Sequence, residues 1–190
     1  VYRDRTVDFF NQHIEAAVQL DCDHMVVSTG FAYLDVDAED AFGWCAEAMG
    51  RIARKAEQEG VTLAVEPFTK YTTHICNEAS QLRRLLRTVN SPRLMGLADT
   101  DVIATTAVDT FSTFLDVIGP ENLGHVHFVD GNPGGHLVPG DGVLDLDGAL
   151  EKLKAIHYTG ALGLEVLDRR YVFAPEAAMK QAMDWYKERI

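Results

Sequence analysis

The chain has 190 residues, of which 47% are hydrophobic and 24% are charged, and its formal net charge is −12. This composition is that of a globular protein with a substantial core, and no apolar run approaches the roughly 18 residues that indicate a membrane-spanning helix. Because the negative charge would repel a phosphate backbone, we expect a small-molecule ligand, with neither nucleic acid nor membrane as a partner.

Strand-like and helix-like segments alternate along the chain. Short apolar runs that end at polar residues or glycine predict the strands, and apolar residues at helical intervals predict the helices. In chain order we expect a helix over 6–20, a strand over 24–30, a helix over 38–59 with its C-cap at Gly60, a strand over 61–66, a helix over 82–89, a strand over 93–99, a helix over 110–118, a strand over 123–130, a glycine-rich loop over 130–142, a helix over 146–156, a strand over 161–167 and a helix over 175–190.

Strands separated by helical crossovers predict an α/β fold with a parallel sheet, and the recurring unit favours a (β/α)8 TIM barrel. A complete barrel usually needs about 250 residues, and only five strands are predicted here. We interpret these as strands four to eight of a barrel whose earlier part precedes Val1, and we expect residues 1–190 to form one domain.

The location of the protein is predicted from its cysteines and from its opening residues. Cys22, Cys45 and Cys76 are odd in number and share no C-x-x-C spacing, which argues against a disulfide framework or a zinc knuckle. The opening VYRDRTVDFF lacks the pattern of a signal peptide. A cytoplasmic protein is the simplest expectation, and a homo-oligomer is compatible with the sequence.

Four side chains stand at or near the ends of successive predicted strands. Glu66, Asp99, His127 and Glu165 follow one another at intervals of 33, 28 and 38 residues, each close to the length of one strand–helix unit. In a β/α barrel the carboxyl ends of all strands meet on the catalytic rim. We therefore expect these four residues to lie together at that rim.

Alternation along the strands predicts that these side chains face inward. In 61–66, Glu66 shares a face with Thr62 and Ala64, and Leu63 and Val65 share the opposite face. The same rule places His125 with His127 and places Glu165 with Gly163. Each strand thus has an apolar outer face for helices to cover and an inner face that carries a ligand-type residue.

Three carboxylates and an imidazole in one small volume predict a divalent metal site. Buried carboxylates that face one another repel and take up protons unless a cation is present. This donor set suits Mn²⁺, Mg²⁺ or Co²⁺, with Zn²⁺ as a further candidate, whereas thiolates would have indicated zinc. The alternative is that the four residues pair with Arg, Lys or backbone groups.

At these residues the sequence resembles the xylose isomerase-like TIM barrels, and within them the group that includes D-tagatose 3-epimerase and fructoselysine 3-epimerase. The motifs are A-V-E-P-F at 64–68, G-L-A-D-T at 96–100, H-V-H-F-V-D at 125–130 with P-G-D-G at 139–142, and L-E-V at 164–166. The resemblance implies that Glu66, Asp99, His127 and Glu165 hold the metal. It also implies that Glu66 and Glu165 are catalytic and exchange a proton with the carbon next to a ketone, through an enediolate.

Three departures from the tagatose 3-epimerase pattern bear on the substrate. Members carry a Glu, a His and an Arg where this chain has Thr72, Val102 and Pro133. The form H-F-V-D-G-N-P-G-G-H-L-V-P-G-D-G is closer to the fructoselysine 3-epimerase branch. The resemblance therefore implies an isomerase that acts on a ketose or, preferably, a substituted ketose.

Further residues are candidates for contact with the sugar. His136 lies in the glycine-rich loop, Tyr71 lies in the loop after Glu66, and His125 and Asp130 flank the strand position that carries His127. Each also has a structural interpretation: a solvated loop residue for His136 and Tyr71, a packed neighbour for His125, and a turn-forming or ligand-orienting carboxylate for Asp130. Asp101 would face inward only if its strand continued past Asp99.

Other functions stay open at this point. The same barrel could support inosose dehydration or hydroxypyruvate isomerisation. An endonuclease IV-like phosphodiesterase is disfavoured by the acidic balance and the scarcity of histidine at the rim. From another class, the chain could be an inactive fragment or a sugar-binding protein, because five strands of eight would leave two unpaired sheet edges.

Overall fold

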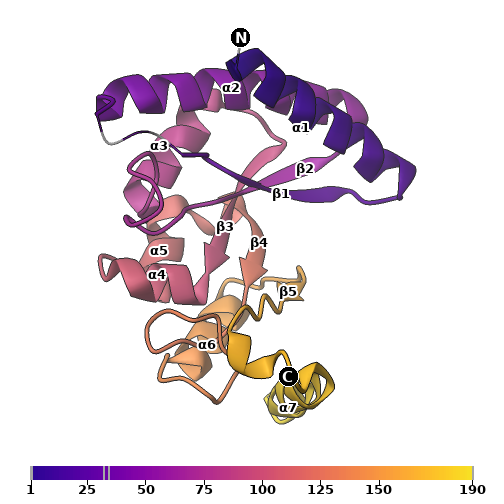
Figure 1. Cartoon of the computed structure of the whole chain (residues 1–190), viewed down its shortest axis with the longest axis vertical. Coiled ribbons are helices and arrows are strands. Elements are labelled where there is room, and N and C mark those ends of the chain that lie inside the picture. Colours follow the sequence, from indigo (N-terminus) through magenta and orange to yellow (C-terminus); the bar gives the residue numbers. More distant parts are fainter. Residues whose placement is uncertain (1, 32, 34, 190) are drawn as a thin grey trace.

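A computed structural model describes residues 2–31, 33 and 35–189, in which strands and helices alternate (Figure 1). Five strands form one sheet in the order β1-β2-β3-β4-β5, and every neighbouring pair is parallel. The strands are β1 His24–Ser28, β2 Thr62–Glu66, β3 Leu94–Asp99, β4 Leu123–His127 and β5 Leu162–Gly163. The predicted α/β architecture, part of a TIM barrel, is confirmed.

One helix precedes β1, and at least one helix follows each of the five strands. They are α1 Tyr2–Gln19, α2 Ala38–Glu59, α3 Ala79–Val89, α4 Thr100–Thr106, α5 Phe111–Ile118, α6 Leu146–Ala155 and α7 Pro175–Lys187, with 3-10 turns η1 Pro120–Asn122 and η2 Arg169–Tyr171. Figure 1 shows α1 and α2 side by side at one end of the molecule and α7 at the other. No helix in the described part of the chain is long and apolar enough to cross a membrane.

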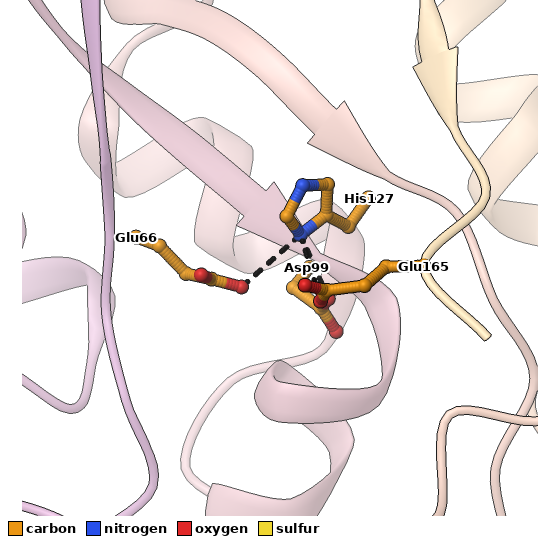
Figure 2. A group of neighbouring side chains, drawn as sticks. All are labelled: Glu66, Asp99, His127 and Glu165. Carbon is orange, nitrogen blue, oxygen red and sulfur yellow. Dashed lines mark hydrogen bonds and ion pairs between the residues drawn. The ribbon is translucent and has the colours of Figure 1, made fainter. Parts of the chain in front are cut away.

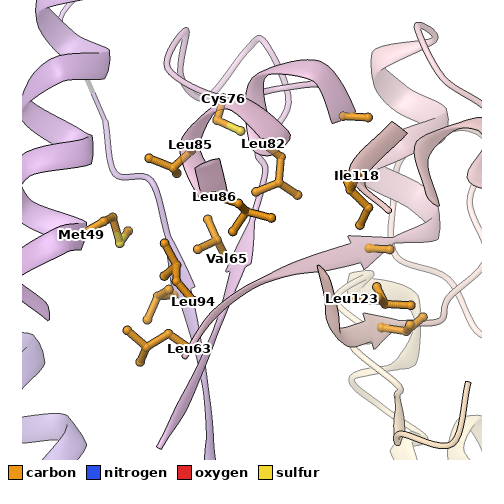
Figure 3. Packing of buried hydrophobic residues seen from close by; sticks show 14 of the residues in the cluster. Met49, Leu63, Val65, Cys76, Leu82, Leu85, Leu86, Leu94, Ile118 and Leu123 are labelled. Carbon is orange, nitrogen blue, oxygen red and sulfur yellow. The ribbon is translucent and has the colours of Figure 1, made fainter. Parts of the chain in front are cut away.

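The hydrophobic core lies between the sheet and the helices that cover its outer face (Figure 3). Leu63 and Val65 of β2 are fully buried there, and they belong to the same cluster as Met49 of α2, Leu82 of α3 and Ile118 of α5. Val126 and Phe128 occupy the corresponding face of β4 and its continuation. This face is the apolar one predicted from alternation, which leaves the opposite face for Glu66 and His127.

The register of the strands aligns their carboxyl ends. Ser28 pairs with Glu66, and Asp99 pairs with His127. His127 in turn pairs with Gly163. Three of the four predicted metal ligands are therefore the last residues of neighbouring strands, and the fourth, Glu165, follows shortly after the last residue of β5.

All five strands are shorter than the sequence predicts, and the differences are largest in β4 and β5. The run 123–130 is strand only to His127, because the chain then turns and Asp130 forms a bridge with Leu137. The run 161–167 is strand only at Leu162 and Gly163, which pair with β4 alone among the described residues. Glu165 therefore lies two residues beyond its strand, and its backbone is not fixed by the ladder.

Capping groups set both boundaries of α2. Asp37 accepts the backbone N–H groups of Glu39 and Asp40 at the start of α2, and Gly60 ends that helix with φ +76°, as predicted. Helix α4 was not predicted, because its sequence TDVIATT is rich in β-branched residues that disfavour helices. Asp99 starts it by accepting the N–H groups of Asp101 and Val102, both at 2.8 Å.

Candidate metal centre

Glu66, Asp99, His127 and Glu165 converge at the carboxyl ends of the strands (Figure 2). One donor atom from each residue lies within 4.8 Å of all the others. Glu66, Asp99 and His127 are buried, and the side chain of Glu165 is 38% exposed. The structure thus brings together all four residues that the sequence singled out as metal ligands.

The three carboxylates surround a single nitrogen atom. His127 Nδ1 lies 3.1 Å from Glu66 Oε1, 3.3 Å from Glu165 Oε2 and 3.4 Å from Asp99 Oδ2. Figure 2 shows Glu66 and Glu165 reaching this nitrogen from different sides. One N–H group cannot donate to three carboxylates at once. The site therefore has more acceptor oxygens than the imidazole of His127 has hydrogen bonds to donate.

The pKa values show how strongly these groups interact. Burial opposes the charged form of His127, but the carboxylates of Asp99, Glu165 and Glu66 outweigh it and raise the pKa of His127 to about 11. The nearby imidazoles of His127 and His136 lower the pKa of Glu165 to about 2. Burial raises the pKa of Glu66 above its usual value. In the cluster formed by Glu66, Asp99, His127 and Glu165, the imidazole of His127 therefore stays positively charged beside the carboxylates.

Asp99 shows that the cluster fits a cation. Its Oδ1 atom accepts two backbone N–H groups at the start of α4, which fixes the carboxylate. Its Oδ2 atom is buried and lacks a well-oriented hydrogen-bond donor among the described residues, although imidazole nitrogens of His127 and His136 lie 3.4 and 3.3 Å away. A buried, unsatisfied carboxylate oxygen is costly, and a divalent ion held by oxygen and imidazole donors would satisfy it.

Among the described residues, His136 is the one predicted substrate contact that forms ion pairs with carboxylates of the metal-ligand cluster. Its Nε2 atom lies 3.3 Å from Asp99 Oδ2 and 3.5 Å from Glu165 Oε2. Its Nδ1 atom lies 2.9 Å from Asp101 Oδ2. Sequence reasoning did not assign Asp101 to the site, because strand alternation would have to continue past Asp99 to aim it inward, whereas it sits in the first turn of α4.

The other three predicted contacts lie in different surroundings. The ring of His125 meets that of His127 edge to face at 5.4 Å. Tyr71 is 82% exposed, with Lys70 Nζ 5.7 Å from the centre of its ring. Asp130 is buried, and its carboxylate accepts the backbone N–H groups of residues 131, 140, 142 and 144 at 2.9–3.0 Å. Contact of these residues with a sugar stays a prediction.

Comparison with known proteins finds relatives among sugar-converting enzymes. The family profile described as xylose isomerase-like TIM barrel matches residues 1–189. Fructoselysine 3-epimerase from Shigella flexneri is 26% identical over 187 residues, which are 97% of this chain and 67% of that enzyme. The structure resembles D-psicose 3-epimerase from Clostridium cellulolyticum H10, solved with D-tagatose, with a TM-score of 0.86 and 18% identity over 98% of this chain and 71% of that one. It also resembles the IOLI protein with a bound zinc atom, with a TM-score of 0.80 and 19% identity over 94% and 66% of the two chains.

Proposed function

This chain belongs to the xylose isomerase-like TIM barrel family, and from that membership we propose that it uses a divalent metal ion to epimerise a ketose, or a substituted ketose, at carbon 3. The observation that carries this proposal is the convergence of Glu66, Asp99 and Glu165 on the Nδ1 atom of His127. A family relative, fructoselysine 3-epimerase, supplies the type of reaction.

The metal would be held by Glu66, Asp99, His127 and Glu165. The bound ion would polarise the ketone and stabilise the negative charge that develops when the neighbouring carbon loses its proton. Carboxylate-rich sites with imidazole suit Mn²⁺, Co²⁺ or Mg²⁺, and the zinc atom in the IOLI protein keeps Zn²⁺ among the candidates. Among these ions we propose Mn²⁺ as the first to test.

Glu66 and Glu165 would be the proton-transfer pair. One would remove the proton from carbon 3, and the other would return a proton to the opposite face, which inverts that carbon. Their approach from different sides of the cluster suits this division (Figure 2). Burial raises the pKa of Glu66, and a raised pKa makes a carboxylate a stronger base.

The proposed substrate class is a ketose that carries a substituent. The fructoselysine 3-epimerase relative aligns over nearly the whole chain, and Thr72, Val102 and Pro133 replace residues that the tagatose 3-epimerase pattern would supply. Tyr71, which is exposed in the loop after β2, and His125, beside His127, are proposed sugar contacts.

Hydrogen exchange tests this proposal directly. Fructoselysine is incubated in deuterated water with Mn²⁺ and the wild-type protein, Glu66→Gln or Glu165→Gln, and deuterium at carbon 3 is followed by NMR. We expect exchange in the wild type and a loss of at least about 100-fold in either variant, the low end of what an acid–base group contributes. Glu121→Gln is the matched control, since Glu121 is exposed on η1 at the other end of the strands.

The outcomes separate the rival functions. Undiminished exchange in both glutamine variants would overturn the assigned roles. Loss of water from the sugar would indicate a dehydratase, and deuterium at another carbon would indicate a different isomerase. Binding of the sugar without any exchange would favour a binding protein.

A further inference from the structure

His136 occupies an unusual backbone position next to the metal centre. It lies in the glycine-rich loop between β4 and α6, and its φ of +48° is one that non-glycine residues rarely adopt. Its side chain is 17% exposed. A largely buried imidazole held at a strained position requires surroundings that fix it there.

Asp101 provides those surroundings. Its carboxylate, 2% exposed, accepts the backbone N–H of Gly134 at 2.6 Å and that of His136 at 3.1 Å. The same carboxylate lies 2.9 Å from His136 Nδ1. The loop passes so close that a Cβ atom on Gly131 would lie 1.8 Å from Asp101 Oδ1. The loop and the first turn of α4 are thus joined through one carboxylate, which orients the imidazole.

The orientation determines what the other ring nitrogen can do. When Nδ1–H donates to Asp101 and an ion replaces the proton on Nε2, the lone pair of Nε2 is directed to the side that Asp99 and Glu165 share, where the ion would lie. Histidines that bind metals commonly donate their second ring N–H to a carboxylate in this way, which fixes the tautomer and the ring orientation. The carboxylate–imidazole pair of Asp101 and His136 has this arrangement.

The distances from His136 Nε2 to Asp99 and Glu165 also suit a shared ion, and His136 would have to move closer to the other two ligands, since it lies outside the group of four whose donor atoms are all within 4.8 Å of one another. His127 Nδ1 and His136 Nε2 lie 3.4 and 3.3 Å from the same buried oxygen, Asp99 Oδ2. Two donors bonded to one ion at about 2.1 Å and at right angles are about 3 Å apart. Both imidazoles are therefore spaced from this oxygen as neighbouring ligands would be, whereas neither is a well-oriented hydrogen-bond donor to it.

We propose that His136 is a fifth protein ligand of the metal, oriented by Asp101. This inference rests on the proposed function, because it requires a divalent ion at the centre. It assigns His136 to the metal rather than to the sugar hydroxyls that the sequence suggested. A second imidazole makes the donor set softer, which favours Mn²⁺, Co²⁺ or Zn²⁺ over Mg²⁺.

Pulsed EPR of the Mn²⁺-loaded protein counts the directly bound imidazole nitrogens. We expect two in the wild type and one in His136→Gln. The control is His125→Gln, which removes an imidazole that faces His127 edge to face but makes no ion pair with a carboxylate of the cluster among the described residues. It should keep both nitrogens.

Metal affinity gives a second readout that is independent of activity. Asp101→Asn removes the charge that orients His136, and loss of such an outer partner costs about 10- to 100-fold in affinity. Titration with Mn²⁺ should show a loss of this size in Asp101→Asn.

One bound nitrogen in the wild type, a count that needs no variant to fold, would overturn the role of His136 and leave the proposed function standing. A wild-type protein that binds no Mn²⁺ at a specific site would overturn both.

Discussion

Asp99 and His127 are paired residues on adjacent strands, and His127 Nδ1 lies 3.4 Å from Asp99 Oδ2. The ladder between β3 and β4 fixes the backbones of both residues, so their side chains meet without any loop having to order. Asp99 is also the N-cap of α4. One carboxylate therefore joins the sheet, a helix terminus and the candidate metal centre.

The two roles of Asp99 can be separated by substitution. Asn keeps an oxygen that can cap α4 but loses the charge, whereas Ala loses both. We expect Asp99→Asn and Asp99→Ala to weaken Mn²⁺ binding alike in titration calorimetry. In urea denaturation of the metal-free protein, the Ala variant should be less stable than the Asn variant by about 1 kcal/mol, the usual value of an N-cap. Equal stability of the two variants would contradict the capping role.

The metal-free protein should lose stability as the pH rises above neutrality. The folded state raises the pKa of His127 to about 11, so this imidazole stabilises the fold fully below about pH 6.5, its ordinary pKa. That contribution is lost as the pH rises toward 11. Thermal unfolding in the presence of a chelator should therefore show a midpoint that falls from about pH 6.5 upward, and the fall should be smaller in His127→Gln. Parallel curves for the two proteins would contradict this.

At acidic pH the contribution of Glu165 to stability changes with pH in the opposite direction. The pKa of Glu165 is lowered to about 2, so its contribution is present above its ordinary pKa of about 4.3. It is lost as the pH falls toward 2. Glu165→Gln should unfold with a weaker pH dependence than the wild type between these two values. An unchanged dependence would show that Glu165 does not interact with the imidazoles in the metal-free protein.

Metal binding should release protons. Both His127 and His136, whose pKa is raised to about 12 by Asp101, Asp99 and Glu165 against the effect of burial, hold protons that an ion would replace. The affinity for Mn²⁺ should rise with pH between about 6 and about 8. Calorimetry in buffers of different ionisation enthalpy measures the protons released, and a value of zero would contradict the account.

Two glycine substitutions should have opposite effects on stability. In Gly131→Ala the new methyl group would overlap Asp101 Oδ1, so we expect a loss of about 1–3 kcal/mol, typical of overpacking. At Gly43, in α2, an added Cβ atom would meet no atom within 4 Å, and Gly43→Ala should gain up to about 1 kcal/mol from helix propensity. Urea denaturation measures both. Equal tolerance of the two would show that the loop does not pass close to Asp101.

Asp130 should prove important for stability whether or not it touches a sugar. Its buried carboxylate accepts four backbone N–H groups of the glycine-rich loop. Asp130→Ala would leave these donors without their acceptor, and we expect a loss of about 2–3 kcal/mol in urea denaturation. A loss below about 0.5 kcal/mol, the low end for a single hydrogen bond, would indicate that the loop finds other partners.

The sequence predicted those site residues whose positions are fixed by strands. Glu66 and Asp99 end apolar runs and His127 lies near the end of one, and alternation gives their direction without knowledge of the loops. The contact between Asp101 and His136 could not be predicted, because it depends on an unrecognised helix, α4, and on a loop that places His136 at positive φ. The shortness of β5 could not be predicted either, because LGLEV has the pattern of a longer strand and only pairing decides where it ends.

The most direct test of the central claim is the metal dependence of carbon-3 exchange. The protein is stripped with a chelator, incubated with fructoselysine in deuterated water, and then given Mn²⁺, while NMR follows deuterium at carbon 3. The account predicts no exchange before the ion is added and exchange after it, with none restored in Asp99→Asn. Exchange at the same rate in the stripped protein, or restored equally in Asp99→Asn, would contradict the assignment of this centre.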